Sequence, residues 1–335
     1  MPSPVTPSPD RKDPATLFAA AQAGDRVALA RLLSLIERGG APSRVIASLA
    51  YQTQLDSYTV GITGAPGAGK STLTDQLIAI ARGSGQVGVL AIDPSSPFSG
   101  GAILGDRVRM QNHALDESVF IRSMATRGHL GGLAVAVPDA VRVLSAAGFS
   151  MVFIETVGVG QQEVSVASAA DTTMVVVNPG WGDAIQANKA GLMEIADLFV
   201  INKADRPGAR ETRRDLEQML DLTALDGWRP PILETVASTG DGCQELWDSI
   251  GAHRADLEAR GLLEARRRQR LEREFHQIVA ARVEQRIHSP QFAALLGEVT
   301  DALAGGKIDP YEAADRMLSA IADDDDDQAD DGATA

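Results

Sequence analysis

The chain contains a glycine-rich octapeptide, Gly64-Ala65-Pro66-Gly67-Ala68-Gly69-Lys70-Ser71, between a β-rich run at residues 58–63 and a helical run at residues 72–82. This order of strand, glycine-rich turn and helix matches the P-loop pattern. Its glycines let the backbone approach phosphate oxygens, so that successive N–H groups and the helix N-terminus point at negative charge. We therefore expect the octapeptide and Thr72 to bind a nucleotide, with Lys70 at the β and γ phosphates and the Ser71 hydroxyl on Mg²⁺.

Further β-rich runs follow along the chain, and helical stretches separate them. They cover residues 87–93, 119–123, 151–155, 172–178, 198–202 and 232–236. Alternation of this kind predicts an α/β fold with a mostly parallel, doubly wound sheet and helices on both faces. In such a sheet the ligand binds beyond the carboxyl ends of the strands, so we expect the functional residues in the loops that follow these runs.

A guanine-binding motif is indicated by Asn202-Lys203-Ala204-Asp205, which follows a predicted strand and resembles the Asn-Lys-x-Asp signature of GTPases. The Asp205 carboxylate can accept hydrogen bonds from both the ring N–H and the exocyclic amine of guanine, a paired donor edge that adenine lacks. After the next strand, Val236-Ala237-Ser238 occupies the place of the Ser-Ala pair of many GTPases, with Val236 instead of the serine. We expect the Ala237 N–H to reach the guanine oxygen, and we predict that the protein binds GTP and GDP.

The acidic residues Asp93, Asp106 and Glu155 are candidates to hold Mg²⁺ together with Ser71, because each lies at or beyond the end of a predicted strand on the ligand side. Asp106 and Glu155 also join Lys70 as candidate catalytic residues. Other interpretations stay open, since Asp93 could belong to a capped turn and Asp106 could cap the helix that follows it.

Glu155 opens the stretch Glu155-Thr156-Val157-Gly158, which resembles the acid-x-x-Gly switch of GTPases with Glu in place of Asp. The Gly158 N–H could donate to the γ-phosphate and so sense its hydrolysis. Gln161 is the candidate to orient the attacking water. Since the sequence offers no stronger base for that task, we expect slow intrinsic turnover that a partner stimulates.

The ends of the chain differ in texture from its middle. Residues 252–286 are dense in Arg, Glu, Leu and Ala and lack Pro, as long amphipathic helices do. We expect a disordered leader at 1–14, an N-terminal helical extension at 15–56, the nucleotide domain at 57–255, a C-terminal helical arm at 256–321 and an acidic, disordered tail at 322–335.

Composition limits the partners of the protein. The formal net charge of -14 argues against sequence-independent binding to nucleic acid or to anionic membranes, both of which need clustered Lys and Arg. The sequence has no signal peptide and no segment apolar enough to span a membrane, so we expect a cytoplasmic protein. Cys243 is the one cysteine, which excludes an internal disulfide and a multi-thiolate metal site within a single chain.

Longer blocks of the sequence resemble the MeaB/ArgK family of GTPases, relatives of the human methylmalonic aciduria type A protein. The blocks are Ala91-Ile92-Asp93-Pro94-Ser95-Ser96, Gly101-Ala102-Ile103-Leu104-Gly105-Asp106-Arg107-Val108-Arg109-Met110, Glu155-Thr156-Val157-Gly158-Val159-Gly160-Gln161 and Gly182-Asp183-Ala184-Ile185-Gln186-Ala187-Asn188-Lys189-Ala190-Gly191. They run through most of residues 58–249, whereas the helical ends are similar to the family in plan more than in motif.

This resemblance implies a role beyond GTP hydrolysis. Members of the family are GTPase chaperones of adenosylcobalamin-dependent acyl-CoA mutases, chiefly methylmalonyl-CoA mutase, which they protect and help to load with cofactor. It also implies a homodimer in which the C-terminal arm reaches the partner subunit, and a coupling segment at 182–191 that includes Asp183, Gln186 and Lys189. The alternatives are an arm that caps its own chain and an ordinary loop in which Asp183 caps a helix.

Rival functions remain to be distinguished. A metallochaperone GTPase needs clustered Cys or His, and the histidines of this chain are scattered. A kinase linked to amino-acid transport is suggested by the older arginine-kinase name of the family, and it would leave a stable phosphorylated protein substrate. An ATPase of the partition type usually has an extra lysine early in the P-loop, where Ala65 and Pro66 stand in this chain.

Overall fold

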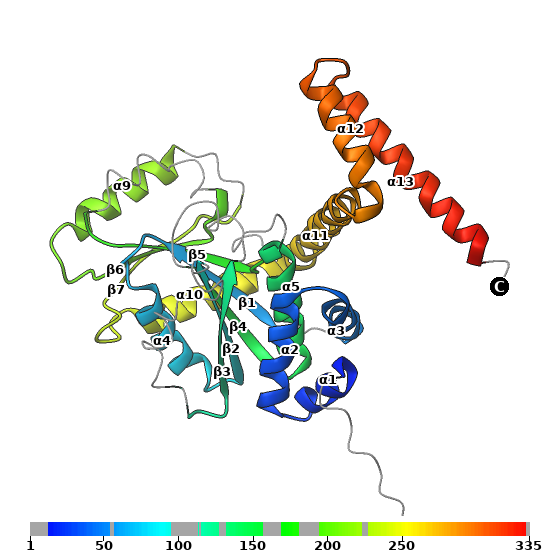
Figure 1. Cartoon of the computed structure of the whole chain (residues 1–335). Coiled ribbons are helices and arrows are strands. Elements are labelled where there is room, and N and C mark those ends of the chain that lie inside the picture. Colours follow the sequence, from blue (N-terminus) through cyan, green and yellow to red (C-terminus); the bar gives the residue numbers. More distant parts are fainter. Residues whose placement is uncertain are drawn as a thin grey trace, which may run out of the picture. The chain divides into compact units, whose positions relative to one another are not determined.

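The computed structural model describes residues 13–53, 57–94, 113, 115–126, 132–156, 169–180, 194–222 and 227–332. Contacts divide the chain into two compact units, Met1–Leu271 and Glu272–Ala335. Each unit has a hydrophobic core of its own. Figure 1 shows the helices and strands that make up both units.

The first unit is built on a sheet that has seven strands within the described residues, and all neighbouring strands are parallel. The strands are β1 (Tyr58–Gly64), β2 (Gln86–Pro94), β3 (Val119–Thr126), β4 (Phe149–Thr156), β5 (Thr172–Val177), β6 (Leu198–Asn202) and β7 (Ile232–Thr235). Their order is β3-β2-β4-β1-β5-β6-β7, so β1 lies in the middle of the sheet with three strands on either side. The predicted doubly wound α/β class is therefore confirmed.

Helices α4 (Lys70–Ala81) and α10 (Cys243–Ala259) cover one face of this sheet. Val60 and Ile62 of β1 share a buried core with Leu73 and Leu77 of α4. Val60 and Ile62 are two positions apart in β1 and so point to the same face, because successive strand side chains point to opposite faces. The core on this face thus continues directly from the helix that follows the glycine-rich turn.

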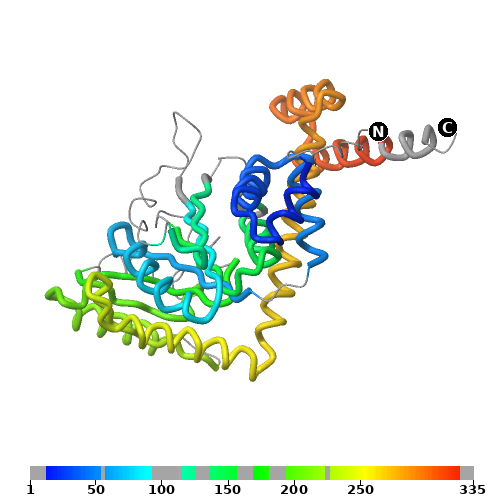
Figure 2. The backbone as a smooth tube through the Cα atoms, turned by 90° about the horizontal axis from the view of Figure 1, so that it is seen from below, coloured from blue at the N-terminus to red at the C-terminus, as the bar shows by residue number. Residues whose placement is uncertain are grey.

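The other face carries α5 (Gly132–Ala146). The N-terminal helices α2 (Arg26–Arg38) and α3 (Ala41–Tyr51) lie beside α5, and α1 (Pro14–Gln22) packs on α2 and α3 (Figure 2). Asp13 and Asp25 begin α1 and α2 as N-caps, and each accepts a backbone N–H of the first turn at 2.8 Å. Helix α9 (Ala209–Asp221) packs on β5 and β6 in a core of its own. Both faces of the sheet are covered in this way.

A buried polar network at the amino ends of β1 and β5 holds α11 (Leu262–Ile287) against the sheet. Asp171, which is 1% exposed, accepts hydrogen bonds from Arg267 at 2.9 and 3.1 Å, from Arg270 and from the Thr59 N–H at 3.0 Å. Burial alone would raise the pKa of Asp171, but the Arg267 hydrogen bond and the charges of both arginines outweigh burial and keep that pKa below its usual range. This end of α11 is therefore fastened by charge pairs.

A second row of hydrogen bonds lies at the same edge. The Tyr58 hydroxyl is 2.6 Å from Thr172 Oγ1, which is 2.8 Å from His253 Nδ1, and His253 Nε2 is 3.3 Å from Asp197 Oδ1. Burial raises the pKa of Tyr58 to about 12. Burial would also raise the pKa of Asp197, but the hydrogen bond and charge of His253 and the charge of Arg266 lower it instead. The row ties α10 to β1, β5 and β6.

The second unit contains the end of α11, a short 3-10 turn (Pro290–Phe292), α12 (Ala293–Ala304) and α13 (Pro310–Gly332). A small core of Phe292, Val299, Ala313 and Met317 joins them. Helix α13 extends past residue 321, where the helical arm was expected to end. Gln291 donates to Asp324 at 2.8 Å and Arg286 also pairs with Asp324, so these partners hold the start of the acidic run. Among the described helices, none combines the length and apolar character that a bilayer span needs.

Candidate nucleotide-binding site

The glycine-rich octapeptide forms the turn between β1 and α4. Gly64, Gly67 and Gly69 have positive φ angles of 129°, 73° and 91°. A Cβ atom on Gly64 would overlap the carbonyl oxygen of Val176 in β5, and one on Gly69 would overlap the Asn202 side chain. The turn therefore needs glycine both for its backbone angles and for its close approach to neighbouring strands.

Lys70 is the first residue of α4, and its side chain folds back over the turn. Its Nζ donates to the carbonyl oxygens of Gly64 at 2.8 Å and Ala65 at 2.9 Å, and the residue is only 5% exposed. The ammonium group therefore lies at the turn, next to the N-terminus of α4 with its partial positive charge. A phosphate group placed there would meet a point charge and backbone donors together.

The start of α4 meets the end of β4 through two hydroxyls and one carboxylate. Ser71 Oγ donates to Glu155 Oε1 at 2.7 Å, and Thr74 Oγ1 lies 3.0 Å from Glu155 Oε2. All three residues are buried. Hydroxyl and carboxylate oxygens are ligands that Mg²⁺ prefers, so the pair of Ser71 and Glu155 fits the expected metal position.

Asn202, at the end of β6, connects the glycine-rich turn to the loop after β7. Its Nδ2 donates to the Ala68 carbonyl oxygen at 2.8 Å, and its Oδ1 accepts from Thr235 Oγ1 at 3.2 Å and from the Ala237 N–H at 3.1 Å. Both ends of this buried amide are thus used. The arrangement brings the predicted phosphate and guanine motifs together across the carboxyl edge of the sheet.

Lys203 and Asp205 follow Asn202 in the guanine motif. Lys203 has a φ of 61°, an uncommon value for a residue other than glycine, and its Nζ donates to the Gly67 carbonyl oxygen at 2.6 Å. Asp205 is exposed in the turn before α9. Its carboxylate is therefore accessible to a base, as the guanine interpretation requires.

Ala237 has a protein partner that the sequence did not indicate. Its N–H donates to Asn202 Oδ1 at 3.1 Å. The turn after β7 closes through the Val236 N–H, which donates to the Asp241 carbonyl oxygen at 2.9 Å. Ala237 would have to exchange Asn202 for the base in order to read the guanine oxygen. That role stays a prediction, and the neighbouring Ser238 is exposed.

Several predicted site residues lie outside the described residues: Asp106, Gly158, Gln161, Asp183, Gln186 and Lys189. Asp93 lies in β2 opposite Ala125 of β3, but its side chain is not among those described. Of the candidate carboxylates for Mg²⁺, Glu155 is thus the one whose side-chain contacts are known.

Two threonines of the site were missed by sequence reasoning. Thr74 contacts Glu155, and Thr235 donates to Asn202. A signal existed for Thr74, because it lies three residues after Ser71 and so on the same side of α4. Thr235 directly precedes the Val236 position that was compared with other GTPases, but its own role was not considered.

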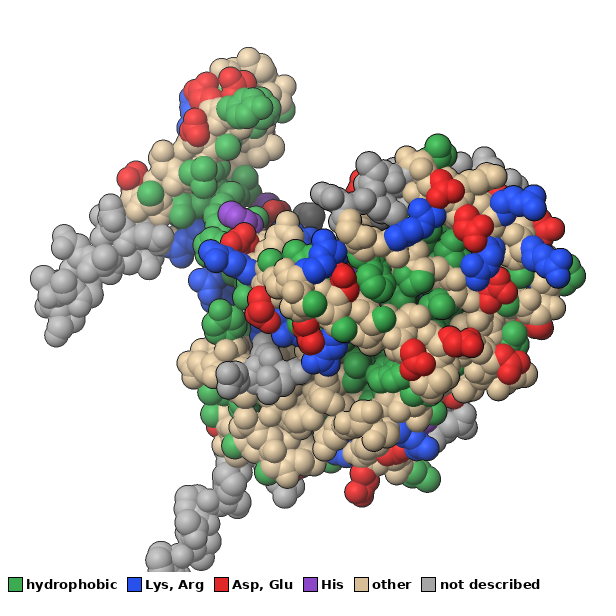
Figure 3. Space-filling view, turned by 180° about the vertical axis from the view of Figure 1, so that it is seen from behind, with side chains coloured by type: hydrophobic (Ala, Val, Ile, Leu, Met, Phe, Trp, Pro, Cys, Tyr) green, Lys and Arg blue, Asp and Glu red, His purple; other side chains and the backbone are tan. Residues whose placement is uncertain are grey.

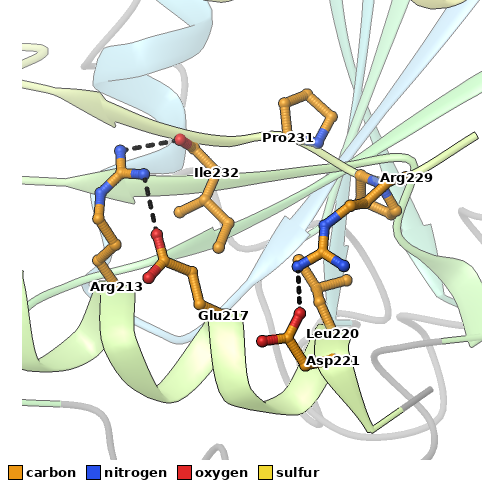
Figure 4. A pocket seen from close by; sticks show the side chains of 8 residues that line it. Arg213, Glu217, Leu220, Asp221, Arg229, Pro231 and Ile232 are labelled. Atoms are coloured by element: carbon orange, nitrogen blue, oxygen red, sulfur yellow. Dashed lines mark hydrogen bonds and ion pairs between the residues drawn. The ribbon is translucent and has the colours of Figure 1, made fainter.

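A cavity of about 310 Å³ lies between α9 and the start of β7 (Figure 4). In its wall Arg213 donates to the Ile232 carbonyl oxygen at 2.9 Å and lies 3.6 Å from Glu217, while Arg229 pairs with Asp221 at 2.7 Å. The Ile232 end of β7 is opposite to the carboxyl edge that carries the glycine-rich turn. The cavity is therefore separate from the nucleotide site. Its arginines and carboxylates neutralise one another and cover the edge strand β7.

Within the residues that the structure describes, no group of three or more His, Cys, Asp or Glu is placed to hold a metal ion. A cation at the carboxyl edge would therefore depend on the Ser71 hydroxyl, a carboxylate and oxygens from outside the protein, as Mg²⁺ does in nucleotide sites.

Known proteins resemble this chain over most of its length. The family model described as Methylmalonyl Co-A mutase-associated GTPase MeaB matches residues 29–291. A Pyrococcus abyssi protein named as a GTPase is 52% identical over 307 residues, which are 89% of this chain and 94% of that protein. The mitochondrial methylmalonic aciduria type A homolog of Caenorhabditis elegans is 32% identical over 331 residues, 90% of this chain and 81% of that protein. A crystal structure of an LAO/AO transport system kinase matches with a TM-score of 0.69 and 25% identity, covering 95% of this chain and 99% of that one.

Proposed function

Because the chain belongs to the MeaB family of methylmalonyl-CoA mutase-associated GTPases, we propose that it couples Mg²⁺-dependent GTP hydrolysis to the protection and cofactor loading of an adenosylcobalamin-dependent acyl-CoA mutase. The resemblance to MeaB/ArgK proteins seen in the sequence is confirmed, and the chain is a P-loop GTPase. The observation that carries the proposal is the family match across residues 29–291, which includes the phosphate and guanine motifs. Methylmalonyl-CoA mutase is the favoured client, since the family is named for it and the Caenorhabditis elegans relative is named for methylmalonic aciduria.

The turn between β1 and α4 would hold the phosphates. Lys70 and the backbone N–H groups of residues 67–72 would stabilise the charge that develops on the γ-phosphate as water attacks in line. Lys70 would exchange the Gly64 and Ala65 carbonyl oxygens for phosphate oxygens. Asn202 would keep the turn attached to β7, and Asp205 would accept hydrogen bonds from guanine.

Mg²⁺ would be held by Ser71 with help from Asp93, Asp106 or Glu155. When bound, it supplies positive charge to the β- and γ-phosphate oxygens. Among these residues Ser71 and Glu155 have direct support, because their oxygens lie 2.7 Å apart and are both buried. The protein's own contribution is to hold these oxygens in a fixed position at the start of α4.

The coupling to the mutase is assigned to segments 94–110, 158–164 and 182–191. They follow β2, β4 and β5, which end at the same edge as the glycine-rich turn. Within them, Gly158 and Gln161 would respond to the γ-phosphate, and Asp183, Gln186 and Lys189 would pass that state to the client.

A homodimer is supported by apolar side chains exposed on the unit Glu272–Ala335. Phe275 is 61% exposed and Val279, one helical turn later, is 43% exposed, while Tyr311 and Leu318 of α13 are also exposed. Figure 3 shows hydrophobic side chains along this part of the chain. An exposed apolar stripe on a helix favours association, and a second copy of this chain is the proposed occupant.

The test is GTP turnover with increasing amounts of purified methylmalonyl-CoA mutase, together with the rate at which the mutase loses activity. We expect the client to accelerate hydrolysis by about 5-fold or more and the GTPase to slow mutase inactivation. Lys70→Ala serves as the control, which should provide no GTP-dependent protection. Unchanged turnover and unchanged inactivation at saturating mutase would overturn the chaperone function while leaving the GTPase intact.

A transport-linked kinase is the second candidate, favoured by the name of the LAO/AO transport system kinase structure. It predicts transfer of the γ-phosphoryl group of labelled GTP to an amino-acid-binding protein. The GTPase predicts that all of the label appears as inorganic phosphate, so one labelling experiment separates the two.

A further inference from the structure

We propose that Thr74 is a positioning residue for GTP hydrolysis, which holds the Glu155 carboxylate in the orientation that it needs to act on Ser71. The inference rests on the proposed Mg²⁺ site and assigns a role to a residue that lies outside the P-loop motif. Thr74 follows Ser71 by three residues in α4, so the two hydroxyls lie on one side of the helix.

The two hydroxyls contact different oxygens of the same carboxylate. Ser71 Oγ is 2.7 Å from Glu155 Oε1, and Thr74 Oγ1 is 3.0 Å from Glu155 Oε2. Two contacts from one helix, one on each carboxylate oxygen, restrain both the position and the plane of the Glu155 carboxylate. Thr74 is 0% exposed and Glu155 is 2% exposed, so water has little access to replace the threonine.

The Thr74 hydroxyl has one proton and two acceptors within reach. The Lys70 carbonyl oxygen is 2.9 Å away, and Glu155 Oε2 is 3.0 Å away. In an α-helix the Lys70 carbonyl already accepts the backbone N–H of Thr74. Glu155 offers a carboxylate, and hydrogen bonds to charged acceptors are stronger. The Thr74 hydroxyl therefore directs its proton at Glu155 Oε2 and donates this hydrogen bond to it.

The consequence for Ser71 follows from its donor and acceptor inventory. A serine hydroxyl carries one proton and two lone pairs. With the proton directed at Glu155, the Ser71 oxygen would turn its lone pairs, and not its proton, toward a cation bound at the start of α4. Thr74 does not contact the cation itself. It keeps Glu155 in the position in which the carboxylate accepts the Ser71 hydrogen bond.

The test compares Thr74→Val, which keeps the shape and removes the hydroxyl, with Thr74→Ser, which keeps the hydroxyl. The first readout is binding: the Mg²⁺ concentration that slows dissociation of a fluorescent GDP analogue. We expect Thr74→Val to raise this concentration by about 10- to 100-fold, the usual effect of losing an outer partner of a metal ligand. The second readout is kinetic, and kcat should fall while the KM for GTP changes little. Thr74→Ser should restore both readouts.

Thr172→Val is the matched control, because Thr172 is equally buried and its hydroxyl is 2.8 Å from His253 at the opposite edge of the sheet. It should lower the Tm and leave the Mg²⁺ requirement unchanged. Thr74→Ala repeats the test with a smaller side chain if the valine variant does not fold. A wild-type Mg²⁺ requirement in both Thr74→Val and Thr74→Ala would overturn the role of Thr74. If wild-type protein itself does not respond to Mg²⁺, the proposed metal site fails instead.

Discussion

The carboxyl and amino edges of the sheet both hold charged side chains that form close contacts, but the partners of these side chains differ. At the carboxyl edge, Lys70 and Lys203 donate to carbonyl oxygens of the glycine-rich turn, which are neutral acceptors. At the amino edge, Asp171 meets two arginines and Asp197 meets a histidine and an arginine. When an anionic ligand replaces the neutral acceptor of a charged donor, the hydrogen bond becomes stronger, because both partners then carry charge. The carboxyl edge is therefore prepared to exchange partners, whereas the amino edge fastens helices.

Lys70→Ala should have the largest effect, and it should fall mainly on activity. We expect kcat/KM for GTP to drop by about 10³-fold, which corresponds to about 4 kcal/mol of lost charge stabilisation. The free energy of unfolding should change by no more than about 1–2 kcal/mol, because the lost hydrogen bonds are offset by removal of a buried charge. Urea unfolding of the nucleotide-free variant, measured beside its turnover, checks both. A larger loss of stability than of activity would make Lys70 a structural residue.

Asp171→Asn should show the opposite pattern. The neutral amide cannot form ion pairs with Arg267 and Arg270, and breaking a buried ion pair from one side destabilises a protein by about 3 kcal/mol. Turnover per folded molecule should stay near that of the wild type, since Asp171 lies at the edge away from the glycine-rich turn. Urea unfolding and a GTPase assay on the same preparation give the two numbers.

Asp221→Asn is the control for the Asp171 variant. The Asp221 pair with Arg229 is 2.7 Å long, against 2.9 Å for Asp171 and Arg267, but the Asp221 and Arg229 side chains are 67% and 53% exposed. Exposed pairs contribute about 0–1 kcal/mol. Equal destabilisation by the two variants would contradict the idea that the amino edge fastens α11 through buried charge.

The sequence was sufficient for the fold and for the motifs of the carboxyl edge. The run expected at residues 198–202 is β6, and the other expected strands differ from the observed ones by a few residues at their ends. This worked because buried parallel strands are local apolar runs and the P-loop is one continuous stretch. Both signals can be read within a short window of residues.

The amino edge could not be predicted in the same way. Asp171 and Arg267 are 96 residues apart in the sequence, and neither belongs to a motif. Arg267 lies in a stretch rich in Arg and Glu, where most charges would be expected on a solvated helix face. Only the folded chain shows which of these arginines turns inward to a carboxylate.

Acid should weaken the amino edge first. The pKa values of Asp171 and Asp197 are lowered from a usual value of 3.8, so the unfolded chain takes up protons at a higher pH than the folded one. The stability that these carboxylates provide is therefore complete above pH 3.8 and is lost as the pH falls through their folded pKa values, at up to about 1.4 kcal/mol per pH unit for each. Urea unfolding between pH 5 and pH 3 should show a shallower decline for Asp171→Asn than for the wild type. Parallel curves would mean that Asp171 does not titrate with folding.

Tyr58→Phe should have the smallest effect, because it removes one hydroxyl from the end of a row. The Tyr58 hydroxyl contacts Thr172, and the contacts of Thr172 with His253 and of His253 with Asp197 do not involve Tyr58, so the later members of the row keep their partners without it. At neutral pH we expect a loss of about 1 kcal/mol, the usual contribution of one hydrogen bond.

At alkaline pH the variant should lose less stability than the wild type. The folded pKa of Tyr58 is about 12 against 10 for the exposed side chain, so its protonated form stabilises the fold fully below pH 10, and this stabilisation is lost as the pH rises towards 12. Tyr58→Phe lacks that titration, and its stability should fall less steeply than that of the wild type between pH 10 and 12. Urea unfolding across this range measures the difference directly, and identical slopes would show that the Tyr58 hydroxyl is not held in its protonated form by the fold.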